Sequence, residues 1–456
     1  MDKSQIKTQK FIIKYFTEIM IKGTTAKRQM IAQVYNNINS ILSKVSSDIT
    51  IKKFFDKVEI VCPIEVVAVV RQRLLDTPGI QQILEAIQFD NMHTLDDIKV
   101  KVNEICASEI QGKTFVIRAK RTGTQDFKST QIEQTVGGYM LAMNSDSKGV
   151  SLKNPEVTIN IELEHHQLNI ITYKHMGMGG FPIGTQGSVL SLMSGGFDST
   201  VASYLTMKRG IKTHFIFFNL GGVAHEIGVK QVAYYLWNKF GSSHRVSFIS
   251  IPFDDVVTEI FKSVSEPYMG VMLKRLMLKA SEKVADSMGI DALITGESVA
   301  QVSSQTLRNL ALIDQVTNKL VLRPLSMMSK PDIIDIAYKI GTRRFAEAMP
   351  EYCGVISKNP VTHGSYERME KEASHFDYSI LDEAVKKSVF VNVDEIDQDV
   401  NEIGQMEIVN DLSSGEYTVI DIRQSADCIK TSVETIKIPF YNLKNEFKKL
   451  PQDKTY

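Results

Sequence analysis

One segment of the sequence, Ser194-Gly195-Gly196-Phe197-Asp198-Ser199-Thr200, has the residue types and spacing of an anion-binding turn. A short apolar run (VLSLM) precedes it and a stretch with helical spacing (VASYLTMKRG) follows, so we expect a strand, a tight turn and a helix. The unpaired N–H groups of a helix N-terminus bind anions, and glycines let the backbone approach a phosphate closely. The Gly-Lys-Ser/Thr ending of a Walker loop is missing. The segment predicts a pyrophosphate-binding loop, although a purely structural Ser-Gly-Gly turn would start in the same way.

Asp198 is the unusual member of this loop, because a carboxylate next to a phosphate is repulsive unless a cation lies between them. We therefore expect Asp198 to hold Mg²⁺ against a pyrophosphate. The glycines of residues 177–187 precede the strand instead of following it, so they indicate a hinge or tight crossover and not a dinucleotide fingerprint.

The elements around the loop follow two patterns. Before residue 176, strand-like segments (10–23, 52–63, 114–121 and 157–175) alternate with helix-like ones (24–45, where threonines could cap the start, 64–80 and 129–143), which predicts small α+β domains. After it, apolar strands at 189–193, 211–220, 246–253 and 291–298 are separated by helices, which predicts a doubly wound parallel sheet buried on both faces. From about residue 385 a new unit begins, with strand segments at 416–428 and 434–443.

The overall composition is that of a globular protein, with 456 residues, 43% hydrophobic and 23% charged. Lys+Arg 53 and Asp+Glu 53 cancel, but residues 1–180 hold 23 basic and 19 acidic residues, 181–360 hold 19 and 15, and 361–456 hold 11 and 19. A basic front and an acidic tail leave a nucleic-acid partner open, beside ordinary surface charge. No secretory signal or membrane span is visible in the sequence. The four cysteines are widely spaced, which excludes a disulfide framework or a zinc ribbon. We therefore expect a cytoplasmic protein.

These motifs carry a resemblance to a known family. SGGFDS resembles the PP-loop of ATP pyrophosphatases, which cleave ATP to AMP and pyrophosphate while adenylating a substrate. Longer segments, including TGESVAQVSSQTLRNL, RPLSMMSKPDIIDIAYKIGT and EYCGVISKNP, resemble the tRNA 4-thiouridine synthetase (ThiI) family of tRNA sulfurtransferases. FVIRAKRTGTQDFKSTQIEQTVGGYML is similar to the THUMP RNA-binding domain, and VIDIRQSADC with IPFYNL to the opening of a rhodanese domain.

The resemblance implies an α/β multidomain fold over essentially the whole chain. We expect a ferredoxin-like domain at 1–60, a THUMP domain at 61–176, a PP-loop ATP pyrophosphatase domain at 177–384, and a linker with a partial rhodanese-like domain at 385–456. It implies ATP and Mg²⁺ as cofactors, with ATP contacts at Leu192, Met193, Ser194, Gly195, Gly196, Asp198, Ser199, Lys274, Gly296 and Gln305. Lys274 would neutralise phosphate charge, although a solvated helix lysine would look the same.

The resemblance also assigns the cysteines. Cys353, flanked by Gly354 and near Lys358, is expected to be a loop-borne thiolate that attacks or resolves a persulfide and forms a disulfide with a rhodanese-domain cysteine. The sequence stops at Tyr456, before the position of that cysteine, and Cys428 follows the first strand, where it would only pack. Either the sequence is a fragment or the sulfur comes from another protein, so we expect adenylation and tRNA binding but impaired sulfur transfer. Cys62 and Cys106 are expected to be structural.

The activity implied is conversion of a tRNA uridine to 4-thiouridine, with a second role in thiamine thiazole biosynthesis. A cysteine desulfurase would donate persulfide sulfur, a ThiS-like sulfur carrier protein is a further candidate partner, and the oligomeric state stays open, a homodimer included. We expect tRNA phosphates to contact two clusters of cations: Lys22, Lys27 and Arg28, and Arg118, Lys120 and Arg121. Two alternatives stay open: a PP-loop adenylating ligase or amidotransferase with another substrate, and a non-catalytic tRNA-binding protein.

Overall fold

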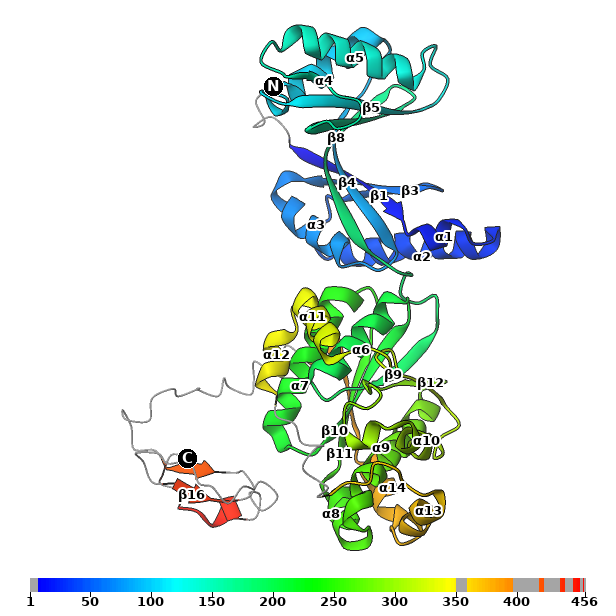
Figure 1. Cartoon of the computed structure of the whole chain (residues 1–456), viewed down its shortest axis with the longest axis vertical. Coiled ribbons are helices and arrows are strands. Elements are labelled where there is room, and N and C mark those ends of the chain that lie inside the picture. Colours follow the sequence, from blue (N-terminus) through cyan, green and yellow to red (C-terminus); the bar gives the residue numbers. More distant parts are fainter. Residues whose placement is uncertain are drawn as a thin grey trace.

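The computed structural model describes residues 7–349 and 359–396, together with 418–421, 435–438, 446–451 and 454. The first two ranges form an eight-stranded and a six-stranded sheet. We divide them into an N-terminal module (7–89), a middle module (90–179) and a parallel-sheet module (180–349 with 359–396). Figure 1 shows the N-terminal module between the other two along the long axis of the molecule. No helix within the described ranges is both long enough and apolar enough to cross a bilayer.

The N-terminal and middle modules share the eight-stranded sheet, in the order β2-β3-β1-β4-β8-β7-β5-β6. Strand β8 pairs antiparallel with both β4 and β7, so it joins the two modules into one continuous sheet. Separate apolar cores lie under α2 and α3 in one module and under α4 and α5 in the other. The elements, in chain order, are β1 (Thr8–Tyr15), α1 (Thr17–Met20), α2 (Thr24–Leu42), β2 (Thr50–Lys53), β3 (Lys57–Pro63), α3 (Val67–Leu75), β4 (Ile80–Phe89), α4 (Leu95–Cys106), β5 (Thr114–Thr122), α5 (Ser129–Met143), β6 (Gly149–Val150), β7 (Val157–Glu164) and β8 (Gln167–Gly179).

Three expectations for this half were wrong in detail. The strand predicted at 10–23 ends at Tyr15, because the Phe16 N–H bonds to the Gly79 carbonyl and the chain turns into α1. Helix α2 is capped by Gly23 with no side-chain cap, so its threonines lie inside the helix. The segment 52–63 is a hairpin of β2 and β3, and the boundary at residue 60 cuts β3, which pairs with β1 over its whole length.

The parallel-sheet module has the strand order β13-β12-β9-β10-β11-β14. Neighbouring strands from β13 to β11 are parallel, and β14 pairs antiparallel with β11 at the edge. The elements are β9 (Ser188–Leu192), α6 (Phe197–Lys208), β10 (Lys212–Asn219), α7 (Gly222–Leu236), β11 (Ser247–Pro252), α8 (Asp254–Ser263), α9 (Met269–Ser287), β12 (Ala292–Ile294), α10 (Leu307–Asp314), β13 (Leu320–Leu322), α11 (Lys330–Ile340), α12 (Arg343–Ala348), α13 (Tyr366–Ser374), α14 (Tyr378–Lys386) and β14 (Val389–Asn392).

Two apolar cores cover the two faces of this sheet. One involves α6, α7 and α11, and the other α8, α9, α10, α13 and α14. This confirms the predicted doubly wound architecture. The central strand β9 lies between β10 and β12, so the chain crosses to opposite sides of β9, and ligands bind outside the strand ends at such a switch point.

The C-terminal boundary differs from the expectation. The linker predicted from residue 385 contains β14, which completes the six-stranded sheet, because its backbone groups pair with those of β11 between Ser247 and Ser250. Beyond it, β15 (Val419–Asp421) and β16 (Thr435–Lys437) form a parallel pair inside the two predicted strand segments. The partial rhodanese-like domain stays a prediction.

Direct bonds hold the N-terminal module against the parallel-sheet module. The Arg73 guanidinium donates to the Asn238 carbonyl at 2.5 Å, and the Lys44 ammonium donates to the Ser242 carbonyl at 3.0 Å. The Asn37 amide donates to the Ile183 carbonyl at 3.1 Å and is buried. The arm formed by the first two modules is therefore anchored on the third.

Candidate functional site

The Ser-Gly-Gly turn lies where the fold places a ligand, between the end of β9 and the start of α6. Gly195 has φ +81°, a left-handed conformation that favours glycine, and Gly196 caps the helix. The Ser199 hydroxyl accepts a bond from the Ser194 N–H at 3.2 Å, and the Thr200 hydroxyl donates to the Gly196 carbonyl at 2.8 Å. These hydroxyls fix the shape of the loop, and the N–H groups of Gly195 and Gly196 are left for an anion.

Asp198, in the first turn of α6, is held by two residues from distant segments. Lys330 Nζ lies 2.8 and 3.0 Å from the two carboxylate oxygens, and Gln301 Nε2 donates to one of them at 2.8 Å. Lys330 is the first residue of α11, and Gln301 lies in the loop after β12. A lysine therefore stands against the carboxylate that was expected to hold a cation. Sequence reasoning missed both residues, although each lies in a segment that carried the resemblance.

A second ionic cluster lies beside the loop around Glu297, whose side chain is 9% exposed. Lys274 Nζ is 2.7 Å from one oxygen, and Arg323 Nε donates to the other at 2.8 Å. The same guanidinium donates two further hydrogen bonds to the Asp314 carboxylate, at 2.9 and 2.6 Å. Burial alone would raise the pKa of Glu297, but the attraction of the two cations prevails and lowers the pKa to about 2. The cluster thus fixes a charged lysine next to the turn.

Gly296 lies against the loop itself. A Cβ atom there would be 2.6 Å from both the Asp198 carbonyl carbon and the Ser199 nitrogen, so only glycine fits. We expected Gly296 to permit a close approach to a nucleotide, and the close approach seen is to the first turn of α6.

Gln305 closes the loop that follows. Its side-chain oxygen accepts a bond from the Ser298 N–H at 3.3 Å, and its carbonyl accepts one from Ala300. Ala300 has φ +66°, which is uncommon for a residue other than glycine, and it directly precedes Gln301. The backbone therefore has an unfavourable conformation next to Gln301, whose side chain contacts Asp198. The expected contacts Leu192 and Met193 lie at the end of β9, and the Met193 N–H bonds to Ile216 of β10 at 2.8 Å.

Two side chains border the loop on the α7 side. His225 Nε2 is 3.5 Å from the Ser194 carbonyl oxygen, and burial lowers the pKa of this histidine, with the contact to Ser194 opposing the shift. Met349 packs on two glycines, since a Cβ on Gly195 or Gly228 would lie 2.6 or 2.9 Å from its methyl carbon. Met349, the residue after α12, therefore lies directly on the loop.

The cations expected to bind tRNA fall in two places. Lys22, Lys27 and Arg28 lie on or beside the turn that opens α2, and Lys27 is 5.4 Å from the centre of the Phe55 ring. Arg118 and Lys120 share the exposed face of β5. The Arg118 guanidinium donates to the Leu152 carbonyl at 2.9 Å, and that of Arg121 donates to the carbonyls of Gly123 and Gln125 at 2.9 and 3.2 Å.

The cysteines and the metal expectation can be compared with the described residues only in part. Cys62 and Cys106 are buried, and burial raises the pKa of their thiols to about 11 and about 12, so neither is a thiolate at neutral pH. Cys353 and Cys428 lie outside the described residues. Among the described residues, no group of three or more His, Cys, Asp or Glu side chains could hold a metal ion.

Comparison with known proteins agrees with this architecture. The family described as "Thiamine biosynthesis protein (ThiI)" matches residues 184–378, the THUMP domain family residues 92–172, and the "ThiI ferredoxin-like domain" family residues 10–83. The tRNA sulfurtransferases of Saccharophagus degradans and Shewanella piezotolerans are each 43% identical to this chain over 98% of it and 94% of their own length. A 4-thiouridine synthetase solved with RNA and bound ATP superposes with a TM-score of 0.75 and 25% identity, over 85% of this chain and 100% of that one. These matches confirm the predicted family and the ferredoxin-like, THUMP and PP-loop folds.

Proposed function

This chain belongs to the tRNA sulfurtransferase family, and from that premise we propose that it uses ATP to convert a tRNA uridine to 4-thiouridine. The observation that carries the proposal is the turn between β9 and α6, where Asp198 is held by Lys330 and Gln301 and Lys274 is fixed beside it by Glu297. A loop with free backbone N–H groups and two lysines nearby suits a nucleotide triphosphate. The likeness to a synthetase solved with RNA and ATP supports the same assignment.

The chemistry explains why one chain would carry an ATP site and a sulfur route. A carbonyl oxygen on a pyrimidine ring is a poor leaving group. In the first step the C4 oxygen attacks the α-phosphorus of ATP, and pyrophosphate leaves. In the second, the terminal sulfur of a persulfide adds to C4 and AMP departs with the former carbonyl oxygen. A thiol then attacks the S–S bond, which forms a disulfide and leaves the sulfur on the ring.

We assign the ATP contacts to the residues predicted from the sequence and add Lys330. The set is Leu192, Met193, Ser194, Gly195, Gly196, Asp198, Ser199, Lys274, Gly296, Gln305 and Lys330. As pyrophosphate leaves, negative charge grows on its oxygens, and the ammonium groups of Lys274 and Lys330 would stabilise it. Both lysines now contact carboxylates at 2.7–3.0 Å, so each is already oriented for a phosphate that enters the loop.

Mg²⁺ would enter with ATP and needs no protein cage. This ion is commonly held by one or two carboxylates together with substrate phosphates, and Asp198 is a carboxylate directly at the loop. The donor set therefore fits once Lys330 moves from Asp198 to a phosphate, with Asp198 as the protein ligand. The ion would supply further neutralisation of the leaving pyrophosphate.

Cys353 is our candidate for the thiol that resolves the persulfide. It follows Met349 by four residues, and four residues of chain span at most about 14 Å. Since Met349 packs on Gly195, the chain that leads to Cys353 starts at the ATP loop. Cys353 would form its disulfide with the cysteine that carries the persulfide. The family resemblance supports a cysteine desulfurase as sulfur donor and a second role in thiamine thiazole synthesis with a ThiS-like sulfur carrier.

The tRNA contacts are assigned to Lys22, Lys27, Arg28, Arg118 and Lys120, which are not tied up in ion pairs among the described residues. Arg121 makes three hydrogen bonds within its own loop, against one from Arg118 to the Leu152 carbonyl, so we expect less from Arg121. Two groups of cations on one continuous sheet, separated along it, suit a long ligand such as the acceptor region of tRNA.

The direct test is pyrophosphate release from ATP with and without unmodified tRNA. We expect stimulation by tRNA, loss of it in Asp198→Asn, and normal activity in the control Asp335→Asn, an exposed aspartate on α11. Stimulation by a small carboxylate in place of tRNA would favour the ligase alternative. An absence of pyrophosphate release under any condition would favour a non-catalytic tRNA-binding protein.

A further inference from the structure

Two cations lie against the Phe181 ring, where the N-terminal module meets the parallel-sheet module. Lys22 Nζ lies 5.5 Å from the centre of the Phe181 ring, and the Arg209 guanidinium lies 4.9 Å from it. Lys208 directly precedes Arg209 at the end of α6. Phe181 is buried and packs edge-on against Phe16, with ring centres 5.8 Å apart. Two modules thus supply positive charge to one small region.

This cluster lacks its own counterions. Within the described ranges of the chain, no carboxylate lies within ion-pair distance of the side chains of Lys22, Lys208 or Arg209. Lys274 and Lys330, by contrast, each contact a carboxylate at 2.7–2.8 Å. Like charges held close together repel one another, and an anionic ligand removes that repulsion.

The backbone holds the cluster in place. The Phe181 N–H donates to the Lys208 carbonyl at 3.0 Å, and a Cβ on Gly180 would lie 1.9 Å from that same oxygen. The end of α6 and the chain that leaves β8 are therefore in direct contact. The cations do not depend on flexible loops to meet, so the site is largely formed before a ligand binds.

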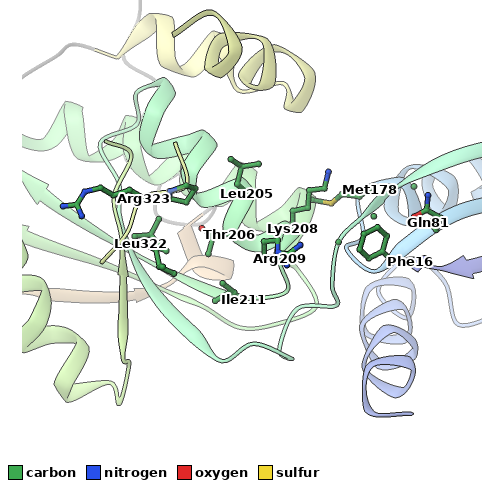
Figure 2. Close-up of a pocket in the computed structure, with 15 residues that line it drawn as sticks. Phe16, Gln81, Met178, Leu205, Thr206, Lys208, Arg209, Ile211, Leu322 and Arg323 are labelled. Atoms are coloured by element: carbon green, nitrogen blue, oxygen red, sulfur yellow. The ribbon is translucent and has the colours of Figure 1, made fainter. Parts of the chain in front are cut away.

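A cavity of about 670 Å³ opens beside the cations (Figure 2). Lys208 and Arg209 line it between one end with Leu205, Leu322 and Arg323 and an opposite end with Phe16 and Gln81. Its size and its place between modules are those of a ligand pocket. The walls are mainly apolar, so a ligand that fits would carry both a phosphate and a flat or apolar part.

We propose that this cavity, with Lys208 and Arg209 in its wall and Lys22 at the neighbouring Phe181, binds the phosphate backbone of the RNA substrate at about one nucleotide. The inference rests on the proposed function, because it takes tRNA as the anion. A polyanion suits cations that come from two modules better than a single small anion does, and an apolar wall with Phe16 can take the face of a base or ribose. The contact would guide the RNA from the basic N-terminal arm toward the ATP loop.

The test is the affinity for unmodified tRNA at several salt concentrations, measured on the full chain. The double variant Lys208→Gln/Arg209→Gln removes two charges at the cavity. The control Lys339→Gln/Lys371→Gln removes two charges from exposed positions on α11 and α13 of the same module. Each phosphate contact contributes roughly 0.7–0.9 to the slope of log affinity against log salt. Loss of the one contact should therefore lower the slope of the cavity variant by about 0.8 and weaken its binding roughly sixfold near 0.1 M salt.

The affinity for ATP, measured in the same samples, should stay unchanged in the cavity variant. Equal tRNA affinity and slope in the cavity and control variants would overturn the inference and leave the proposed function standing. A wild-type chain that does not bind tRNA would instead refute the proposed function and this inference with it. If the cavity variant loses affinity for AMP or inorganic phosphate but not for tRNA, the site serves a free phosphate compound and the assignment to RNA is wrong.

Discussion

Replacing Glu297 by glutamine tests whether the buried ionic cluster holds Lys274 beside the ATP loop. The variant keeps the shape of the side chain but removes the charge that faces Lys274 and Arg323. Arg323 keeps Asp314, so Lys274 is the residue that loses its partner. Breaking a buried ion pair on one side typically costs about 3–5 kcal/mol.

The pKa of Glu297 gives an independent magnitude. A fall from the ordinary value of 4.5 to about 2 corresponds to roughly 3 kcal/mol of added stability at neutral pH. Because this pKa is lower in the folded state, the stabilisation is fully present above the unfolded-state pKa, about 4.5, and is lost as the pH falls toward 2. About half of it should remain near pH 3.

Trp237 provides the assay. It is the single tryptophan of the chain and lies in the core of the parallel-sheet module, so its fluorescence reports unfolding of that module. We expect Glu297→Gln to lower the urea midpoint at pH 7 by about 1 M, from a slope of roughly 2–3 kcal/mol per M. Glu383→Gln, which breaks an exposed pair with Lys386, should change the free energy of unfolding by less than about 1 kcal/mol. Equal midpoints for the two variants, or a difference between wild type and Glu297→Gln that does not shrink from pH 7 to pH 3, would show that Glu297 does not stabilise the module through its charge.

Three further predictions concern the same site. Gly296→Ala would place a methyl group 2.6 Å from backbone atoms of Asp198 and Ser199. The affinity for ATP in a binding titration should therefore fall at least about tenfold, and the free energy of unfolding, followed by Trp237 fluorescence, should fall by about 1–3 kcal/mol. Gly138→Ala, in open space on α5, is the matched control. Lys330→Gln should reduce tRNA-stimulated pyrophosphate release on the order of 100-fold, whereas Lys339→Gln on the same helix should not. Ala300→Gly should raise the free energy of unfolding by up to about 1 kcal/mol, and with it the urea midpoint, because glycine adopts the left-handed backbone at φ +66° without strain. An unchanged or lower midpoint would show that no strain is relieved.

The local parts of the site were predictable, and the contacts across the fold were not. A strand, two glycines and a helix start are adjacent in sequence, so the β9–α6 turn and the parallel sheet followed from residue pattern alone. Lys330 and Gln301 contact Asp198 across 132 and 103 positions of the chain. Nothing in the composition of either segment shows that pairing, because it depends on how β12 and α11 pack.

The predicted ends of elements were wrong because they too depend on contacts between distant segments. The alternating pattern continues past Tyr15, but the strand ends there because Gly79 takes the N–H of Phe16. The break expected at residue 385 reflected a change in sequence character, while β14 belongs to the sheet because β11 offers it a free edge.

ATP-dependent tRNA thiolation by this chain can be measured by nucleoside mass spectrometry of unmodified tRNA incubated with the full chain, ATP, Mg²⁺ and inorganic sulfide. Sulfide is a sulfur nucleophile in its own right, so the result does not depend on a persulfide carrier. We predict 4-thiouridine that requires ATP and disappears in Asp198→Asn. No 4-thiouridine with ATP present, or the same amount without ATP, would contradict the account.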